Sequence, residues 1–244
     1  MSDVEFHETG DGKRIAYRFT QGQGPMLVFL PGYMSDMDGG KATSILAKAK
    51  DEGQACLLLD YSGCGQSPGD FADGTLSIWR DEVLSVINAI TQGSVVVIGS
   101  SMGGWLMLMV GLALGERLAG MVGIAAAPDF TEWGRNDADK AKLNAGETVF
   151  DENPYGPDPT PMHPGFFKDG QSQLTLGVPI NITAPVRLLH GQNDADVPWQ
   201  ISMKLAEQLR SDDIQIALGK DGDHRLSREQ DIALLHRQVW SLLD

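Results

Sequence analysis

The chain has 244 residues, enough to bury a full core and a usual length for one α/β domain. Its 19 basic and 33 acidic residues give a formal net charge of −14, so we expect no nucleic-acid partner and no stable insertion into anionic membranes. No run reaches transmembrane length, and the first residues lack a signal or transit pattern, which predicts a cytoplasmic protein. The two cysteines, Cys56 and Cys64, are expected to be free thiols in a reducing compartment.

The first half of the chain alternates strand and helix patterns. The β-rich stretches 4–8 and 14–20 flank Gly10-Asp11-Gly12, which predicts an antiparallel hairpin. Apolar runs typical of strands buried on both faces follow at 26–30, 55–59, 94–98 and 121–127. Helical patterns cover 41–50, 75–90 with Thr75 as N-cap, and 105–114.

The alternation stops between about residues 128 and 185. Five of the 12 prolines lie between Pro154 and Pro164. A long insertion of this kind predicts a functional lid, because its aromatic residues argue against disorder; the alternative is a loop whose aromatic residues cover the core. These aromatic residues are Phe130, Trp133, Phe150, Tyr155, Phe166 and Phe167.

Strand patterns return at 186–190 and 214–218, and helical patterns at 199–210 and 229–243. The order of elements predicts one α/β domain over residues 1–244. Its sheet is expected to be mostly parallel and doubly wound, with an antiparallel N-terminal hairpin and the lid insertion.

The pentapeptide Gly99-Ser100-Ser101-Met102-Gly103 lies between a predicted strand and a predicted helix. This context is typical of a nucleophile elbow, in which a central serine occupies a strained turn and the flanking glycines leave room for neighbouring backbone. Ser101 is therefore the candidate nucleophile. The alternative is a purely structural turn, because Gly and Ser are common in turns.

A serine nucleophile needs a base, and a carboxylate that orients the base. Among five histidines, only His224 lies in the loop after the last predicted strand and downstream of a candidate acid. The competing histidines are His7 in the hairpin, His163 in the lid, His190 at a strand end and His236 in the last helix.

Two aspartates in one loop compete for the role of the acid. Asp194 is favoured because it lies one turn past a strand, whereas Asp196 is expected to cap a helix or face solvent. Asp223, adjacent to His224, would project away from the imidazole. Asp60 also ends a strand, but its carboxylate is expected to accept hydrogen bonds from amides of the following glycine-rich turn.

The oxyanion hole is expected to consist of backbone amides of Met102, after the nucleophile, and Tyr33, in the first strand-to-helix loop. The Met102 amide also begins a helix, whose dipole favours negative charge there. Gly32, before Tyr33, allows the close backbone approach that this arrangement requires.

Several segments together resemble the α/β-hydrolase family, and within it the palmitoyl-protein thioesterases and acyl-glucuronide esterases. The likeness runs from about residue 30 to the C-terminus and is weakest in the proline-rich lid. It is carried by Leu30–Ser35, Asp60–Gly63, Gly99–Leu108, Arg187–Gly191 with Asp194 and Val197–Trp199, and Asp223–Arg225. The resemblance implies Ser101 as nucleophile, Asp194 as acid and His224 as base, without a cofactor or metal. Because no transit pattern is present, a bacterial relative is expected rather than a mitochondrial protein.

The expected activity is hydrolysis of esters or thioesters with an apolar acyl part, either small molecules or S-acylated proteins. The apolar part is inferred from the lid aromatic residues and from Met34, Met102 and Trp105, which alternatively belong to the core. A small-ester carboxylesterase is the main alternative. An aminopeptidase-like enzyme that binds a substrate amine through Glu132 or Glu147, and a non-catalytic binding protein, are further alternatives.

Overall fold

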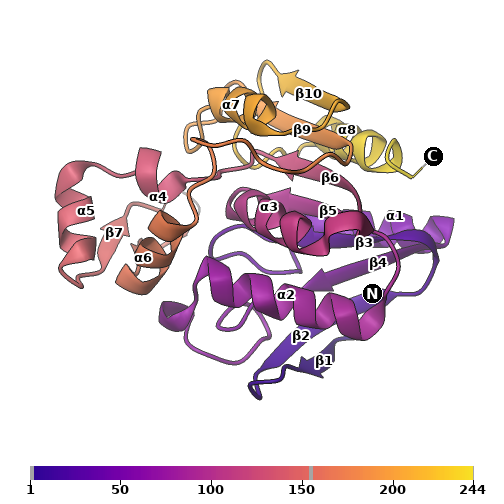
Figure 1. The fold of residues 1–244 in the computed structure, drawn as a ribbon, viewed down its shortest axis with the longest axis horizontal. Coiled ribbons are helices and arrows are strands. Elements are labelled where there is room, and N and C mark those ends of the chain that lie inside the picture. Colours follow the sequence, from indigo (N-terminus) through magenta and orange to yellow (C-terminus); the bar gives the residue numbers. More distant parts are fainter. Residues whose placement is uncertain (1–2, 154–155, 244) are drawn as a thin grey trace.

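The computed structural model describes residues 3–153 and 156–243, and an eight-stranded sheet forms its centre (Figure 1). The strand order is β1-β2-β4-β3-β5-β6-β9-β10. β1 pairs antiparallel with β2 and β2 antiparallel with β4, whereas the other neighbours are parallel. The α/β-hydrolase sheet predicted from the sequence is confirmed. The strands are β1 Glu5–Glu8, β2 Arg14–Thr20, β3 Gln23–Leu30, β4 Gln54–Leu59, β5 Val95–Ser100, β6 Leu118–Ile124, β9 Val186–Gly191 and β10 Ile214–Gly219.

Helices cover both faces of the sheet (Figure 1). α2 (Leu76–Ile90), α3 (Met102–Leu114) and α7 (Gln200–Gln208) pack on one face, and α1 (Gly40–Glu52) and α8 (Glu229–Trp240) on the other. Successive residues of a strand serve opposite faces, as in β3, where Val28 packs toward α2 and α3 and Phe29 toward α1 and α8. Thr75 caps α2 as predicted, its Oγ1 accepting from the Ile78 amide at 3.2 Å. None of the helices within the described residues is long and apolar enough to cross a membrane.

The boundaries of two strands differ from the predicted ones by three residues. β3 begins at Gln23, and β6 spans Leu118–Ile124 instead of residues 121–127. The chain leaves the sheet after Ile124 because Ala125 has a φ of +44°. The Ala127 amide then donates to the Ser101 carbonyl at 3.0 Å, so the end of the predicted strand supports the turn at Ser101 instead.

The insertion over residues 128–185 is more regular than its prolines indicate. It contains α4 (Phe130–Trp133), α5 (Asp137–Asn144), the antiparallel pair β7 (Val149–Asp151) and β8 (Thr160–Met162), and α6 (Pro164–Ser172). Two residue types that are common in loops begin helices here. The Asn136 side chain caps α5, and Pro164 occupies the first turn of α6. Pro154 and Tyr155 lie outside the described residues.

The insertion is anchored to the rest of the chain by buried groups. Asp129, at its start, accepts hydrogen bonds from the Thr175 amide at 2.8 Å and the Leu176 amide at 2.8 Å, near its end. Phe166 and Phe167 are buried in the core, whereas the Phe150 residue is 62% exposed. The aromatic side chains of α6 therefore cover the core, as the alternative interpretation of the insertion expected.

Candidate active site

Ser101 occupies a strained turn between β5 and α3. Its φ of +54° and ψ of −120° are rare for a residue with a side chain. Close packing requires the flanking glycine: a Cβ at Gly103 would lie 2.2 Å from the Leu30 carbonyl oxygen. The turn therefore needs glycine on steric grounds, and it presents the Ser101 hydroxyl at the carboxyl edge of the sheet.

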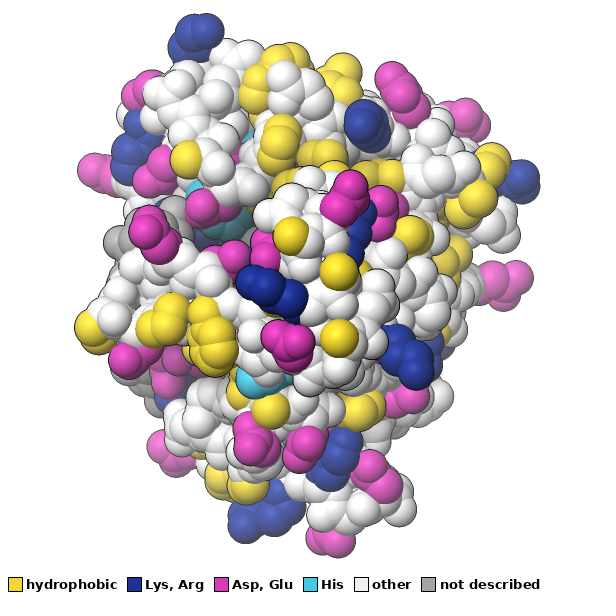
Figure 2. All heavy atoms as spheres, turned by 90° about the vertical axis from the view of Figure 1, so that its left-hand side faces the viewer, with side chains coloured by type: hydrophobic (Ala, Val, Ile, Leu, Met, Phe, Trp, Pro, Cys, Tyr) yellow, Lys and Arg dark blue, Asp and Glu magenta, His cyan; other side chains and the backbone are white. Residues whose placement is uncertain are grey.

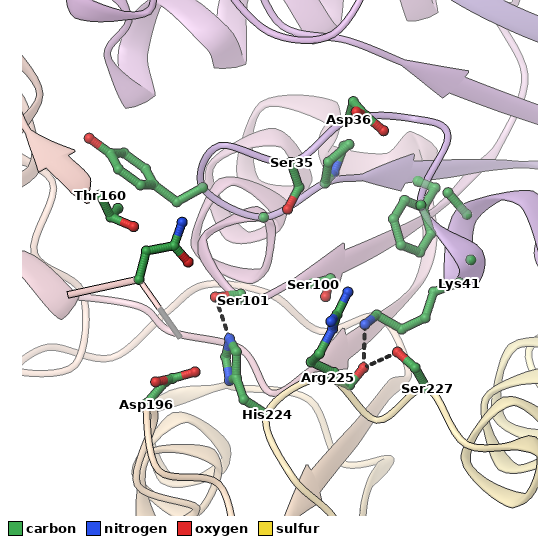
Figure 3. Close-up of a pocket in the computed structure, with 18 of the residues that line it drawn as sticks. Ser35, Asp36, Lys41, Ser100, Ser101, Thr160, Asp196, His224, Arg225 and Ser227 are labelled. Atoms are coloured by element: carbon green, nitrogen blue, oxygen red, sulfur yellow. Dashed lines mark hydrogen bonds between the residues drawn. The ribbon is translucent and has the colours of Figure 1, made fainter. Parts of the chain in front are cut away.

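Ser101, His224 and Asp194 form a continuous hydrogen-bonded chain. His224 Nε2 lies 3.1 Å from Ser101 Oγ, a contact drawn in Figure 3, and His224 Nδ1 lies 2.8 Å from Asp194 Oδ2. The other carboxylate oxygen, Oδ1, accepts from the amides of Asp196 at 2.9 Å and Val197 at 2.8 Å. The tertiary fold thus brings together three residues from three loops that the chain order predicted to meet.

The carboxylate of Asp194 is fully buried yet strongly held in its charged form. Burial raises its pKa, but hydrogen bonds from His190 and His224 and from the Val197 amide outweigh this effect and place the pKa well below its usual value. An ionised carboxylate opposite His224 Nδ1 keeps the Nδ1 hydrogen in place. Nε2 is therefore left as the acceptor that faces Ser101.

His190, considered in the sequence only as a competing base, contacts the acid instead. Its Nε2 lies 3.2 Å from Asp194 Oδ2 and 3.0 Å from the Val197 carbonyl oxygen, and its Nδ1 lies 2.7 Å from Ser202 Oγ. Because the carboxylate and the carbonyl only accept, Nε2 must carry the hydrogen and Nδ1 must accept from the Ser202 hydroxyl. The sequence could have indicated this contact through position, because His190 lies at the end of β9 and the loop that carries Asp194 follows directly.

The remaining histidines are bonded elsewhere. His7 contacts Ser85, His163 contacts Thr148, and His236 contacts Ser44.

The competing acids also have other partners. Asp223 Oδ1 accepts from the Leu226 amide at 3.0 Å, and Asp196 is exposed at the cavity wall beside His224 (Figure 3). Asp60 accepts from the Gln66 amide at 2.8 Å, as predicted, and also from the Met37 amide at 2.7 Å. Asp60 therefore joins the glycine-rich turn to the Tyr33 loop.

Both segments expected to supply the oxyanion hole lie beside Ser101. A Cβ at Gly32 would be 3.3 Å from Ser101 Cβ, so the loop that carries Tyr33 approaches Ser101 closely. Met102 is the first residue of α3, where amides have no partner within the helix. The Tyr33 hydroxyl donates to the Pro161 carbonyl at 2.9 Å and so connects this loop to the insertion.

A cavity of about 440 Å³ opens at Ser101, and most of the residues that line it have polar side chains. The wall includes Lys41, Ser100 and Arg225 on one side, and Asp151, Glu152, Asn153 and Thr160 from the insertion. Lys41 and Arg225 were not singled out in the sequence, because their closeness depends on two segments 184 residues apart.

The apolar residues expected near the substrate lie elsewhere. Met102 and Trp105 are at most 1% exposed and belong to the core, and Met34 is 51% exposed. Within the described residues, no aromatic residue of the insertion lines the cavity. Glu132 pairs with Lys140 at 2.7 Å and Glu147 is exposed, so neither of the proposed amine-binding acids lines the described wall.

Asp194, Asp196 and His224 place potential ligand atoms within 4.8 Å of one another. Two of these groups are already engaged, since Asp194 accepts four hydrogen bonds and His224 Nδ1 contacts the same carboxylate. The hydrogen bonds already made by these groups therefore argue against a metal site within the described residues.

The model of the Alpha/beta hydrolase family matches residues 27–231. The chain belongs to this family. It is 35% identical over 252 residues to the human protein called palmitoyl-protein thioesterase ABHD10, mitochondrial, covering 100% of this chain and 81% of that protein. The mouse protein of that name is 36% identical over 249 residues, covering 100% of this chain and 83% of the relative.

Solved structures show the same hydrolase architecture over the whole chain. Mouse alpha/beta hydrolase domain-containing protein 10 superposes with a TM-score of 0.92 at 34% identity, covering 100% of this chain and 99% of that one. A crystal structure from Agrobacterium vitis also has a TM-score of 0.92, at 35% identity, covering 99% of this chain and 100% of that one. The predicted family and the resemblance to palmitoyl-protein thioesterases are thereby confirmed, and the match from Agrobacterium vitis is a bacterial structure of the same fold.

Proposed function

We propose that this hydrolase cleaves carboxylic esters or thioesters through an acyl-enzyme on Ser101. The observation that carries the proposal is the continuous contact of Asp194, His224 and Ser101 at 2.8 and 3.1 Å, at the mouth of a cavity. A non-catalytic binding protein has no need for this arrangement. The family likeness to thioesterases supports the same reaction class.

The geometry suggests a two-step reaction. Ser101 Oγ attacks the acyl carbon while His224 Nε2 takes the hydroxyl proton, and the oxyanion lies against the amides of Tyr33 and Met102. The bond from carbon to the leaving oxygen or sulfur then breaks, and His224 returns the proton to the leaving atom. Water, activated by His224, attacks the acyl carbon and releases the acid and free Ser101.

The proposed substrates are acyl thioesters, as in palmitoyl-protein thioesterases, or acyl esters, including acyl-glucuronides. A small-ester carboxylesterase is the second candidate, and the polar residues that the insertion contributes to the cavity wall favour it. Chain-length dependence separates these candidates, since each methylene removed from water contributes up to about fourfold to kcat/KM. The cytoplasmic location expected from the sequence stays a prediction, which cell fractionation tests.

The deciding experiment measures kcat/KM for matched oxyesters and thioesters from acetyl to palmitoyl. Ser101→Ala should lower kcat by up to about a million-fold. Ser44→Ala is the matched control, because it removes another serine hydroxyl that contacts a histidine, His236, at 3.3 Å. A Ser101→Ala variant with activity near that of the wild type would refute the mechanism.

In the same series, a rise in kcat/KM with chain length that favours thioesters indicates a depalmitoylase-like enzyme. A maximum at short acyl chains indicates the carboxylesterase.

A further inference from the structure

Two basic side chains meet in the cavity on the same side of Ser101 (Figure 3). Lys41 comes from the first turn of α1, and Arg225 follows His224 in the loop after β10. The Lys41 ammonium donates a hydrogen bond to the backbone carbonyl of Arg225. The proposed reaction uses neither side chain.

The charge of Lys41 is poorly compensated by the protein. In the described part of the chain no carboxylate forms an ion pair with Lys41, and its hydrogen-bond partner is a neutral carbonyl. Burial, and then the nearby Arg225 charge, lower the pKa of Lys41 to about 8, whereas Asp223 and Asp231 act weakly in the opposite direction. A cation in this situation is stabilised by an anion that enters the cavity.

The start of α1 adds to the positive potential around Lys41 and Arg225, the pair that forms the positive corner of the cavity. Gly39 and Gly40, at the start of α1, line the same cavity; the helix has no side-chain cap and no acidic residue in its first turn. Its dipole therefore adds positive potential beside Lys41. Four acids also line the cavity. Asp151 and Glu152 belong to the insertion, on the wall that carries Thr160, and Asp151 is paired with Arg135; Asp36 lies in the Tyr33 loop and Asp196 beside His224 (Figure 3).

The corner also contrasts with the rest of the molecule. The chain has a net charge of −14, and acidic side chains are spread over the face that the insertion forms (Figure 2). Solubility accounts for scattered surface acids. It does not account for two basic side chains placed together beside a nucleophile.

We propose that Lys41 and Arg225 bind an anionic group, a carboxylate or a phosphate, on the leaving alcohol or thiol of the substrate. The proposal rests on the proposed hydrolase function. His224 must deliver its proton to the leaving atom, so the leaving group lies against the loop that carries His224 and Arg225. The anion takes no part in bond breaking and departs with the protonated alcohol or thiol.

The test compares 3-carboxyphenyl butyrate with the neutral 3-carbamoylphenyl butyrate, which has the same shape. The wild type should prefer the carboxylated ester, and Lys41→Met or Arg225→Gln should reduce the ratio of the two kcat/KM values by about 10- to 100-fold. Lys41→Arg should retain the preference. Lys50→Met, at the exposed end of the same helix, removes the same charge and should leave the ratio unchanged.

Two further substrates show which anionic group binds better and whether it lies on the leaving group or on the acyl part. A phosphorylated phenyl butyrate shows whether phosphate or carboxylate binds better, and either preference supports the proposal. The phenyl ester of adipic acid carries its carboxylate on the acyl part, and an equal preference for this ester would overturn the assignment to the leaving group.

Equal losses on the charged and neutral esters in Lys41→Met would overturn the anion site. They would show that Lys41 only holds the Arg225 carbonyl and the His224 loop.

A binding measurement separates failure of this proposal from failure of the hydrolase mechanism. Calorimetry on the Ser101→Ala protein compares 3-hydroxybenzoate with 3-hydroxybenzamide, the two leaving groups, without turnover. Tighter binding of the carboxylate, lost in Lys41→Met, is the expected result. Equal binding would overturn the anion site even if Ser101-dependent hydrolysis is established.

Discussion

Replacing Ser202 by Ala should destabilise this hydrolase through a single buried hydrogen bond. Ser202 Oγ lies 2.7 Å from His190 Nδ1, and both residues are 1% exposed. Without the hydroxyl, the Nδ1 lone pair has neither a protein donor nor water. An unsatisfied buried acceptor costs about 1–3 kcal/mol, which lowers Tm by about 2–12 °C in a chain of this size.

The chain offers a matched control at its surface. Ser85 Oγ lies 2.8 Å from His7 Nε2, and both residues are half-buried. Water can replace the lost hydroxyl there, so Ser85→Ala should change the free energy of unfolding by less than about 0.5 kcal/mol. Because the two hydrogen bonds have similar lengths, the difference between the variants measures the effect of burial.

Ser202→Ala should also reduce turnover through the acid. Without the Ser202 hydroxyl, the His190 ring loses the contact that fixes its Nδ1 side, so the hydrogen bond from its Nε2 to Asp194 Oδ2 at 3.2 Å is less firmly held. Losing one such hydrogen bond corresponds to a decrease in kcat of about tenfold. Asp194 would then be held less firmly against His224.

Urea unfolding and ester kinetics on the two variants provide the assay. Equal free energies of unfolding for Ser202→Ala and Ser85→Ala would refute the argument from burial. A destabilised Ser202→Ala protein with the kcat of the wild type would show instead that His190 supports the fold without acting on Asp194.

Three further predictions concern the same site. Asp194→Asn should lower kcat by about 10⁴-fold while Asp196→Asn lowers it less than tenfold, and steady-state kinetics that reverse this order would reassign the acid. Gly103→Ala, whose Cβ would lie 2.2 Å from a strand carbonyl, should cost about 3 kcal/mol in urea unfolding, whereas Gly165→Ala, with nothing within 4 Å, should cost none. The preference for carboxylated esters should fall as the pH rises through about 8, because Lys41 is charged below its pKa and neutral above it; a preference that is constant up to pH 10 would contradict this role.

Local patterns predicted most of the sheet and the nucleophile turn. The apolar runs of β3 to β6 and the helical periodicity of α2 indicate directly which residues of each element are buried. The motif Gly-x-Ser-x-Gly between a strand and a helix indicates the strained turn at Ser101. Boundaries were less accurate where a tertiary contact decides them. Ala125 to Ala127 continue the apolar run of β6, but they turn away to contact the Ser101 carbonyl.

The insertion was harder to interpret because its caps resemble loops. Asn136 and Pro164 are turn signals when read alone, yet each starts a helix. Its aromatic residues indicated order correctly, but periodicity did not reveal which surface they cover. Phe166 and Phe167 face the core, and the cavity is lined instead by polar residues of the insertion.

The sequence alone determined the class of the fold, the order of its strands along the chain and the residue types that can form a Ser, His and Asp chain. These features depend on short-range patterns and on the order in which loops reach one edge of a parallel sheet. Only the tertiary structure decided that Asp194 contacts His224, that Ser202 and His190 hold this acid, and that Lys41 and Arg225 share one corner of the cavity. Such contacts join segments far apart in the chain, and their geometry depends on how helices and loops pack around the sheet, which no local pattern encodes.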